Sequence, residues 1–450
     1  MNDSPEHSYV CNRLGRIRIL PLASGQLACT KNKLIRMNAV SSSTPLVTMI
    51  MAAYNAEPFL EQSLGSLLNQ TYTNFEIICV DDGSTDGTVA EIERIAASHT
   101  NGNKIHLLHT NHVGAGEARN LALRQAHGEY IGFLDADDFV DSHLLEKAIS
   151  RAKDTAADIV IWDLWYFDNN AKMDQYPPVG TLSFNEFDDG SPTFNYKKNP
   201  DHIFNSFQNW IWNKLFRKSL LEENHILFPD WPRAQDLQFT CLALLTAQRI
   251  TLLYERLSHY RINRSNSNME SSNKHPIDFL HAFIQFREEL EQRGYYEEVQ
   301  RSYVNWALHS ALSNMFFFQH QYDTFALVFD ALRAGGFQKM DITNHATSDY
   351  IFETEWLKEY HMIMSDTPEN ALMYFTQRIM SDNATLVSEL NRADREKKQL
   401  QSQIEQQTRA MEVLQKNCEQ ELQHTRRSAE YRLGRLALRI PRALQRRLHR

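Results

Sequence analysis

A short segment of the chain, YIGFLDADDF at residues 130–139, runs from apolar side chains directly into three carboxylates. In an extended segment, side chains two residues apart point the same way, so Asp135 and Asp137 can converge. Crowded carboxylates repel one another unless a cation lies among them. A cluster of oxygen ligands suits Mg²⁺ or Mn²⁺. The segment therefore indicates a divalent metal site, whereas Asp138 is equally well explained as a turn or cap residue.

A second acidic pair, Asp81 and Asp82, ends another apolar segment, FEIICVDD. Either cluster alone is explained by the preference of Asp for turns and helix starts. Two clusters after two apolar segments favour a metal or nucleotide site, because ligands of parallel sheets bind beyond the carboxyl ends of the strands.

The elements that must position these acids alternate along the chain. Short apolar segments predict strands at 46–54, 75–82, 104–109, 128–138 and 158–167. Helical spacing of apolar residues predicts helices at 57–70, 86–99, 114–126 and 141–152. This alternation predicts an α/β fold, Rossmann-like, with a mostly parallel sheet and helices on both faces.

Composition excludes several classes of protein. The 450 residues are 42% hydrophobic, which is enough for a large core, and the length suggests two or three domains. The five cysteines form no CxxC pair, which argues against a zinc site or a disulfide framework and fits a reducing cytosol. No apolar run reaches the roughly 18 residues of a membrane span. Residues 1–44 are expected to form a disordered arm.

Three blocks, in their order and spacing, resemble family 2 glycosyltransferases with the GT-A fold. They are TMIMAAYNAEPFLEQSLGSLLNQTYTNFEIICVDDGSTDGT, GAGEARNLALRQAHGEYIGFLDADD, and WIWNKLFRKSLLEENHILFPD followed by AQDLQF. The resemblance covers residues 45–270. It implies inverting transfer of a sugar from a nucleotide diphosphate sugar, such as a UDP-sugar, to a hydroxyl of a glycan or lipid-linked acceptor.

Carried over by position, the resemblance implies a site for the nucleotide-sugar donor. Tyr54 would stack on the base, Asp82 would accept a hydrogen bond from the base's imide nitrogen, and Arg119 would lie near the phosphates. Without the family, Tyr54 reads equally well as a core aromatic residue and Arg119 as a charge on a helix surface.

The DXD motif of that family would be Asp135, Ala136 and Asp137. Asp135 and Ala136 would contact the donor, and Asp137, together with Asp135, would hold Mn²⁺ or Mg²⁺. A divalent ion there neutralises the departing diphosphate, so the leaving group needs no proton donor.

Asp236 matches the position of the family's catalytic base. The acceptor hydroxyl loses a proton as it attacks, and a placed carboxylate can take that proton. The alternative is that Asp236 caps the helix that follows it. The family usually has Glu-Asp here, whereas this chain has Gln235-Asp236; a neutral neighbour removes repulsion and should make Asp236 a somewhat weaker base.

Further candidates flank the third block. Aromatic residues that could stack on an acceptor sugar are Trp210, Trp212 and Trp231, although tryptophans more often simply pack. Basic residues that could face the donor phosphates are Lys214, His259, Arg261 and Arg264. A structural cation is the alternative for Lys214, and a solvated loop is the alternative for the last two.

The rest of the chain carries no chemistry. Residues 271–380 have helical spacing and predict a helical extension. A heptad predicts a coiled coil over 381–425, and hence a homo-oligomer. Its seam is Leu386, Leu390, Ala393, Lys397, Leu400, Ile404, Gln407, Met411, Leu414 and Cys418.

The last segment, residues 426–450, holds nine Arg and one Glu mixed with leucines. This pattern predicts a basic amphipathic tail on an anionic membrane surface. A nucleic-acid arm is the alternative, but nothing else in the chain supports nucleic-acid binding, and the net charge is −9.

The sequence thus predicts a cytoplasmic glycosyltransferase attached to the inner face of the membrane that acts in surface-polysaccharide synthesis. Another nucleotide-dependent transferase is less favoured because the chain has no Gly-rich phosphate loop followed by Lys. A non-catalytic scaffold with a degenerate transferase fold, oligomerised by the coiled coil, remains the alternative because of Gln235.

Overall fold

The computed structural model describes residues 44–177, 187, 190–231, 234–263, 275–428 and 432–435. The expected N-terminal arm lies almost entirely outside these residues, as do Arg264 and most of the basic tail.

Four parallel strands form the first half of a nine-stranded sheet, in the order β3-β2-β1-β4. Each coincides with a strand expected from an apolar segment. Their bounds are β1 Val47–Ala53, β2 Phe75–Asp81, β3 Ile105–His109 and β4 Tyr130–Phe133. The carboxyl ends of β2 and β4 therefore lie at the same edge, which brings the two acidic clusters to one side of the sheet.

The second half of the sheet is mixed, in the order β8-β6-β9-β5, with β7 paired to β6. Strand β8 runs antiparallel to both β4 and β6, whereas β6 and β9 are parallel. Half of the pairings between described strands are antiparallel, so the sheet is less parallel than expected. The bounds are β5 Phe139–Val140, β6 Ile159–Asp168, β7 Met173–Gln175, β8 Lys214–Arg217 and β9 Ile250–Ile262.

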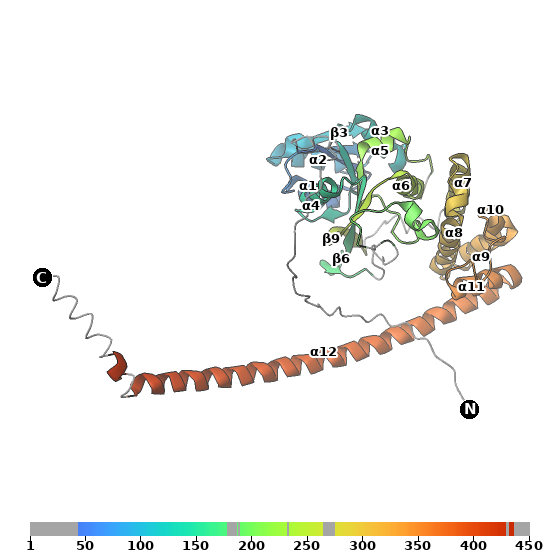
Figure 1. Ribbon diagram of the computed structural model, residues 1–450. Coiled ribbons are helices and arrows are strands. Elements are labelled where there is room, and N and C mark those ends of the chain that lie inside the picture. The colour runs from blue at the N-terminus through green and yellow to red at the C-terminus, as the bar shows by residue number, and fades with distance from the viewer. Residues whose placement is uncertain are drawn as a thin grey trace, which may run out of the picture. The chain divides into compact units, whose positions relative to one another are not determined.

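Helices cover both faces of the sheet, because alternate residues of the central strands enter two separate cores (Figure 1). Ile50 of β1 packs in one core with α3 and α6, whereas Met49 and Met51 pack in the other with α1, α2 and α4. The helices are α1 Glu57–Leu68, α2 Thr88–Ser98, α3 Ala115–Gln125, α4 Leu144–Thr155, α5 Lys218–Glu223 and α6 Gln235–Thr246.

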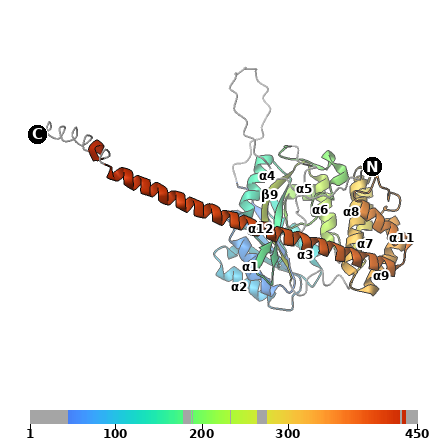
Figure 2. The same ribbon diagram turned by 90° about the horizontal axis from the view of Figure 1, so that it is seen from below.

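A group of helices follows the sheet, as expected from the spacing after residue 270, and both ribbon views draw α7, α8, α9 and α11 together (Figures 1 and 2). They are α7 Asp278–Gln292, α8 Tyr296–Phe318, α9 Tyr322–Ala331, the π-helical turn Leu332–Gly336, α10 Phe337–Lys339 and α11 Thr354–Ser365.

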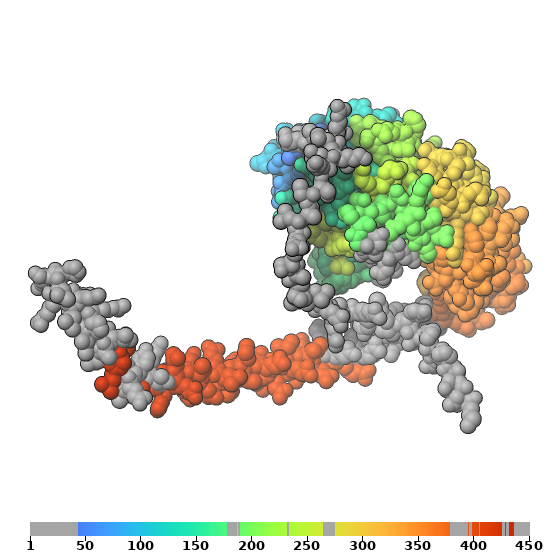
Figure 3. Space-filling model, viewed as in Figure 1, coloured from blue at the N-terminus to red at the C-terminus, as the bar shows by residue number. Residues whose placement is uncertain are grey.

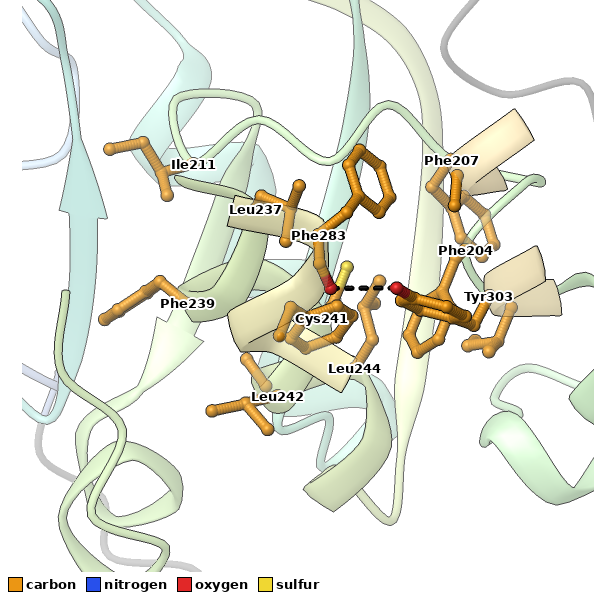
Figure 4. Packing of buried hydrophobic residues seen from close by; sticks show 14 of the residues in the cluster. Phe204, Phe207, Ile211, Leu237, Phe239, Cys241, Leu242, Leu244, Phe283 and Tyr303 are labelled. Atoms are coloured by element: carbon orange, nitrogen blue, oxygen red, sulfur yellow. Dashed lines mark hydrogen bonds between the residues drawn. The ribbon is translucent and has the colours of Figure 1, made fainter. Parts of the chain in front are cut away.

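These helices share a core with α6 and with the segment before it. Phe283 of α7 and Tyr303 of α8 pack with Phe204 and Leu244, and the Tyr303 hydroxyl donates to the Phe283 carbonyl at 2.8 Å (Figure 4). Arg293, just after α7, donates to the Asn224 carbonyl at 2.8 Å. The space-filling view shows α7 beside the green segment of residues 190–230 (Figure 3).

The final helix, α12, is continuous over Pro368–Arg427, so no break separates the helical extension from the expected coiled coil. Ala371 and Phe375 near its start are buried. Seam residues farther along are exposed in this single chain: Leu400 is 58%, Ile404 61% and Met411 72% exposed. Within the part of the chain that the structure describes, no helix is long and apolar enough to cross a membrane.

Candidate active site

Arg119 holds together two carboxylates that lie far apart in the sequence. Helix α3 places its guanidinium beyond the carboxyl end of β4. There Nη2 donates to Asp135 Oδ1 at 2.7 Å and Nη1 donates to Asp236 Oδ1 at 3.1 Å. The Arg119 side chain is only 10% exposed, so the guanidinium itself is largely shielded from water. The first residue of the DXD motif and the expected base thus share one cation.

Asp236 has the environment of a proton acceptor. It is the second residue of α6, whose N-cap is Ala234, so it does not occupy the capping position that was its alternative role. Burial, and secondarily the Asp135 charge, raise its pKa from 3.8 to about 6 despite the opposing effect of Arg119. Its carboxylate keeps 26% exposure, which leaves room for a hydroxyl to reach it.

The turn after β4 is held by a buried arginine. The backbone N–H of Arg261 donates to Asp138 Oδ1 at 2.7 Å, and its Nε donates to the Asp137 carbonyl at 2.6 Å. Arg261 is only 4% exposed. It therefore positions the DXD turn, and it is not part of a solvated loop over the donor. Asp138, at 1% exposure, belongs to this support.

The side chains of the DXD motif differ in exposure. Asp135 and Asp137 are half-buried, whereas Ala136 is buried in the core, so only its backbone can face a ligand. Three negative charges, from Asp135, Asp137 and Asp138, add to burial in raising the pKa of Tyr260. The acids are therefore gathered in one place.

The residues present fit a divalent ion that is shared with a diphosphate. Carboxylates two residues apart supply the hard oxygen ligands of Mg²⁺ or Mn²⁺, and such ions commonly take their remaining ligands from water and substrate phosphates. Among the described residues, no group of three or more His, Cys, Asp or Glu could hold a metal ion by itself. The ligands from the protein would thus be Asp135 and Asp137.

An exposed aromatic pair lies where a nucleobase is expected. Tyr54, just after β1, is 49% exposed, and its ring lies 4.3 Å from the His112 ring, tilted by 34°. Asp82 Oδ1 accepts from Val113 N at 2.7 Å, and Asp82 Oδ2 accepts from Gly114 N at 2.9 Å. Asp82 therefore builds the loop that carries His112, in addition to any contact with a base.

Lys214 is fully buried and structural. Its Nζ donates to the Gln208 and Trp210 carbonyls at 2.6 and 2.8 Å and to Asn213 Oδ1 at 2.8 Å. Burial lowers its pKa from 10.5 to about 7. The loop it holds carries Trp212, which is 3% exposed.

Three aromatic rings stack on one another at this loop. Trp212 lies 4.9 Å from Trp210 and 5.4 Å from Tyr260, both nearly parallel to it. Packing is therefore the role of Trp212.

Gln235 has a use that a glutamate could not serve. Its Nε2 donates to the carbonyl of Trp231 and so closes the turn that leads into α6. A carboxylate is only an acceptor and could not make this bond. The departure from Glu-Asp therefore stabilises the segment that carries Trp231 and Asp236.

Three residues have surroundings that their sequence context did not reveal. His259 stacks on Phe139 at 4.3 Å, and its Nδ1 lies 2.8 Å from Asp174 Oδ1, so it is tied to β7. The roles of His112 and Arg261 were not predicted, because ring stacking and burial between distant strands leave no local pattern. The only indication in the sequence was position: His112 lies just before the second block, and Arg261 follows the third block.

Comparisons with known proteins agree with this geometry. Residues 48–223 match the sequence model described as Glycosyl transferase family 2. The chain is 32% identical over 221 residues to the uncharacterized glycosyltransferase EpsJ of Bacillus subtilis, a match that covers 49% of this chain and 62% of EpsJ. It is 30% identical over 244 residues to the poly(ribitol-phosphate) beta-N-acetylglucosaminyltransferase TarS of Staphylococcus aureus, covering 52% of this chain and 38% of TarS.

The chain thus spans less than two thirds of the length of these curated relatives. A crystal structure of TarS 1–349 in complex with UDP-GlcNAc superposes with a TM-score of 0.53 at 21% identity, over 74% of this chain and 92% of that one. The expected GT-A fold, followed by a helical region, is confirmed.

Proposed function

Residues 48–223 match glycosyl transferase family 2, and from that premise we propose that the chain is an inverting, metal-dependent glycosyltransferase. Its donor is a nucleotide diphosphate sugar, most simply a UDP-sugar, and its acceptor is a hydroxyl of a glycan or lipid-linked glycan in cell-surface polysaccharide synthesis. The observation that carries the proposal is the double ion pair of Arg119, which gathers Asp135 and Asp236 beside the DXD turn.

The proposed chemistry assigns each group one task. Asp236 takes the proton of the attacking acceptor hydroxyl, and its raised pKa and remaining exposure suit a general base. Attack from the side opposite the leaving diphosphate inverts the anomeric carbon. A divalent ion held by Asp135 and Asp137 would supply charge neutralisation for the diphosphate. Arg119 orients both carboxylates.

The nucleotide lies, in this proposal, against the loop after β1. The exposed ring of Tyr54, next to His112, offers a surface on which a base stacks. The TarS structure matched above contains UDP-GlcNAc, which supports testing uridine nucleotides first.

The proposal places the protein in the cytoplasm, at the inner face of the membrane, as a homo-oligomer. The exposed seam of α12 supports self-association. The nine arginines of residues 426–450 support attachment to anionic lipid.

The function is tested by incubating the full chain with UDP-, GDP- and TDP-sugars and Mn²⁺, then measuring thermal shift and release of the nucleotide diphosphate. A ligand at a hundred times its Kd should add about 2.7 kcal/mol to the free energy of unfolding. Asp137→Ala should abolish turnover and leave the fold intact. Turnover that persists in excess chelator contradicts metal dependence, and binding without turnover identifies a non-catalytic scaffold.

A further inference from the structure

A cavity of about 690 Å³ lies between helix α7 and the segment that leads into α6. Trp231 and Asp230 line it from the α6 side, and α7 lines it along most of its length. It is separate from the residues assigned above to the nucleotide and the metal.

The α7 wall of the cavity is a stripe of hydrogen-bonding groups. Asp278, His281, Gln285 and Glu288 follow one another at spacings of three and four residues, so they share one face of the helix. Oδ2 of Asp278 is buried and has no hydrogen-bond partner among the described residues, and Nδ1 of His275 lies 3.9 Å away, too far for a hydrogen bond. A buried acceptor without a donor is costly, so a small rotation of this side chain toward a ligand hydroxyl in the cavity would be favourable.

The cavity also has an aromatic side, because half-buried Trp231 lines it. A sugar ring has one apolar face that packs on an indole and a rim of hydroxyls that hydrogen-bond to carboxylates and amides. A wall of planar polar groups together with an indole therefore matches a carbohydrate better than it matches an apolar ligand.

The cavity is connected to the catalytic centre through one short segment. Phe228 lies under the Arg119 guanidinium, 5.4 Å from ring centroid to Cζ, and Asp236 lies at the other end. Trp231 is five residues from Asp236, so the two Cα atoms are at most about 18 Å apart. A short oligosaccharide covers such a distance.

The charges of the cavity indicate which carbohydrate would bind. Four carboxylates line it, from Asp230, Asp278, Glu288 and Glu291, against two permanent cations. One of these, Arg287, is already paired with Glu291 at 2.8 Å. The excess of negative charge repels a polyanion such as a polyol phosphate and accepts an uncharged glycan.

We propose that this cavity binds the uncharged sugar units of the acceptor behind the one that is glycosylated, with Trp231 stacking on a ring and Asp278 and Gln285 binding hydroxyls. The inference rests on the proposed function, because it assigns the acceptor of that reaction to the class of neutral glycans. The TarS relative is named for a poly(ribitol-phosphate) acceptor, and this chain would differ from it in that respect.

The test uses the full chain and isothermal titration calorimetry with chitotetraose and cellotetraose as neutral probes and poly(ribitol phosphate) as the polyanion. Gln285→Ala is matched by Gln292→Ala, an exposed glutamine on the same helix that does not line the cavity. At least one neutral probe should bind, Gln285→Ala and Trp231→Ala should weaken it about tenfold or more, and Gln292→Ala should not.

Binding of UDP with Mn²⁺ is measured in parallel, so that the two proposals fail separately. If UDP binds and turnover occurs but neither neutral probe binds, the acceptor inference is overturned and the proposed function stands. Equal affinity of Gln285→Ala, Trp231→Ala and the parent chain for the probe overturns it as well, and so does tighter binding of the polyanion. If the neutral probe binds at the cavity but no donor is bound or turned over, the proposed function fails and the glycan site stands.

Discussion

At the scale of single residues, the site depends on how a few charges share partners. The Arg119 guanidinium pairs with two carboxylates, and the Lys214 ammonium donates to three oxygen atoms. Arg261 holds a backbone turn by hydrogen bonds. Asp135 and its acidic neighbours were predictable from the sequence because they follow an apolar segment, whereas Asp236 was predicted only from the resemblance of the third block. The burial of Lys214 and Arg261 was not, because a charged residue enters a core only where distant backbone carbonyls happen to converge on it.

The pKa of Asp236 gives an expectation for activity. Because that pKa is about 6, kcat/KM should fall about tenfold per pH unit below that value and level off above it, since only the carboxylate accepts a proton. A pH profile of sugar transfer measures this. A profile that stays flat down to about pH 5 would show a base with an ordinary carboxyl pKa.

Removing the base tests the same residue directly. Asp236→Asn should lower turnover by about 10²–10⁴-fold, because the amide cannot take the hydroxyl proton. Asp154→Asn, an exposed acid on α4, is the matched control and should leave turnover unchanged. Normal turnover in Asp236→Asn with a lower melting temperature would mean that Asp236 only stabilises α6.

Replacing Lys214 should lower the free energy of unfolding, because its role is structural. Lys214→Met leaves three oxygen acceptors without a donor and should cost roughly 2–4 kcal/mol, whereas Lys153→Met at an exposed position should cost less than about 0.5 kcal/mol. Urea unfolding measures both. A cost as small as that of the control would contradict the structural role.

The same lysine predicts how stability varies with pH. The folded pKa of Lys214 is about 7 and its ordinary value is 10.5, so the unfolded chain holds more protons between these values. Stability should therefore rise with pH across that window, and the contribution of Lys214 to the rise should vanish in Lys214→Met. An identical pH dependence in both proteins would contradict the depressed pKa.

At the scale of elements, the spacing of apolar residues predicted the strands and helices that bury one face along their own length. Strands β1 to β4 and helices α1 to α4 came from apolar segments and helical spacing, which follow directly from how each element buries one face. Strand β8, with only Lys214–Arg217, was read as part of a motif because four residues carry too little periodicity. Its antiparallel place between β4 and β6 is a tertiary outcome, and it makes the sheet mixed.

The seam of α12 gives a prediction at this scale. Ile404→Lys with Met411→Lys should lower the oligomeric state measured by light scattering, because charge enters the apolar seam. Ser402→Lys with Gln406→Lys adds the same charge away from the seam and should not. Equal masses for the two double variants would show that the seam is not the interface.

Cys418 allows a second, independent test of the interface between α12 helices. It is exposed and free and lies on the seam, so a parallel, in-register pair of helices should cross-link through it under mild oxidation. Cys418→Ser should abolish the cross-link. Oligomers that form without any cross-link would indicate antiparallel helices.

At the scale of the whole molecule, charge is strongly segregated along the chain. Residues 426–450 carry +8, and the other 425 residues carry −17, which leaves the net charge of −9. The acidic part is compatible with the cation site proposed at the DXD turn, and the basic part with the proposed attachment to an anionic surface. The distribution was readable from the sequence, whereas the continuity of α12 between the parts was not.

Removing the basic segment, residues 426–450, should abolish membrane binding without abolishing nucleotide-sugar turnover. A chain ending at Thr425 should no longer sediment with anionic vesicles, since each Lys or Arg near such a surface contributes about 1 kcal/mol. High salt should weaken binding of the full chain. Nucleotide-sugar turnover should persist in the shortened chain. If the shortened chain still sediments at high salt, the exposed Phe316 and Phe317 become the next candidates for attachment.

The continuous helix α12 separates the acidic part of the chain from its basic segment. Sixty helical residues span about 90 Å at 1.5 Å each, many times the Debye length of about 8 Å in physiological salt. Before the basic segment begins at residue 426, the helix holds nine acidic and seven basic residues, so it adds little net charge of its own. On a flexible connection of the same length, the arginines would be free to neutralise the chain's own acids. A stiff spacer of low net charge keeps the opposite charges at its two ends from cancelling one another, and leaves the positive end available to an external surface.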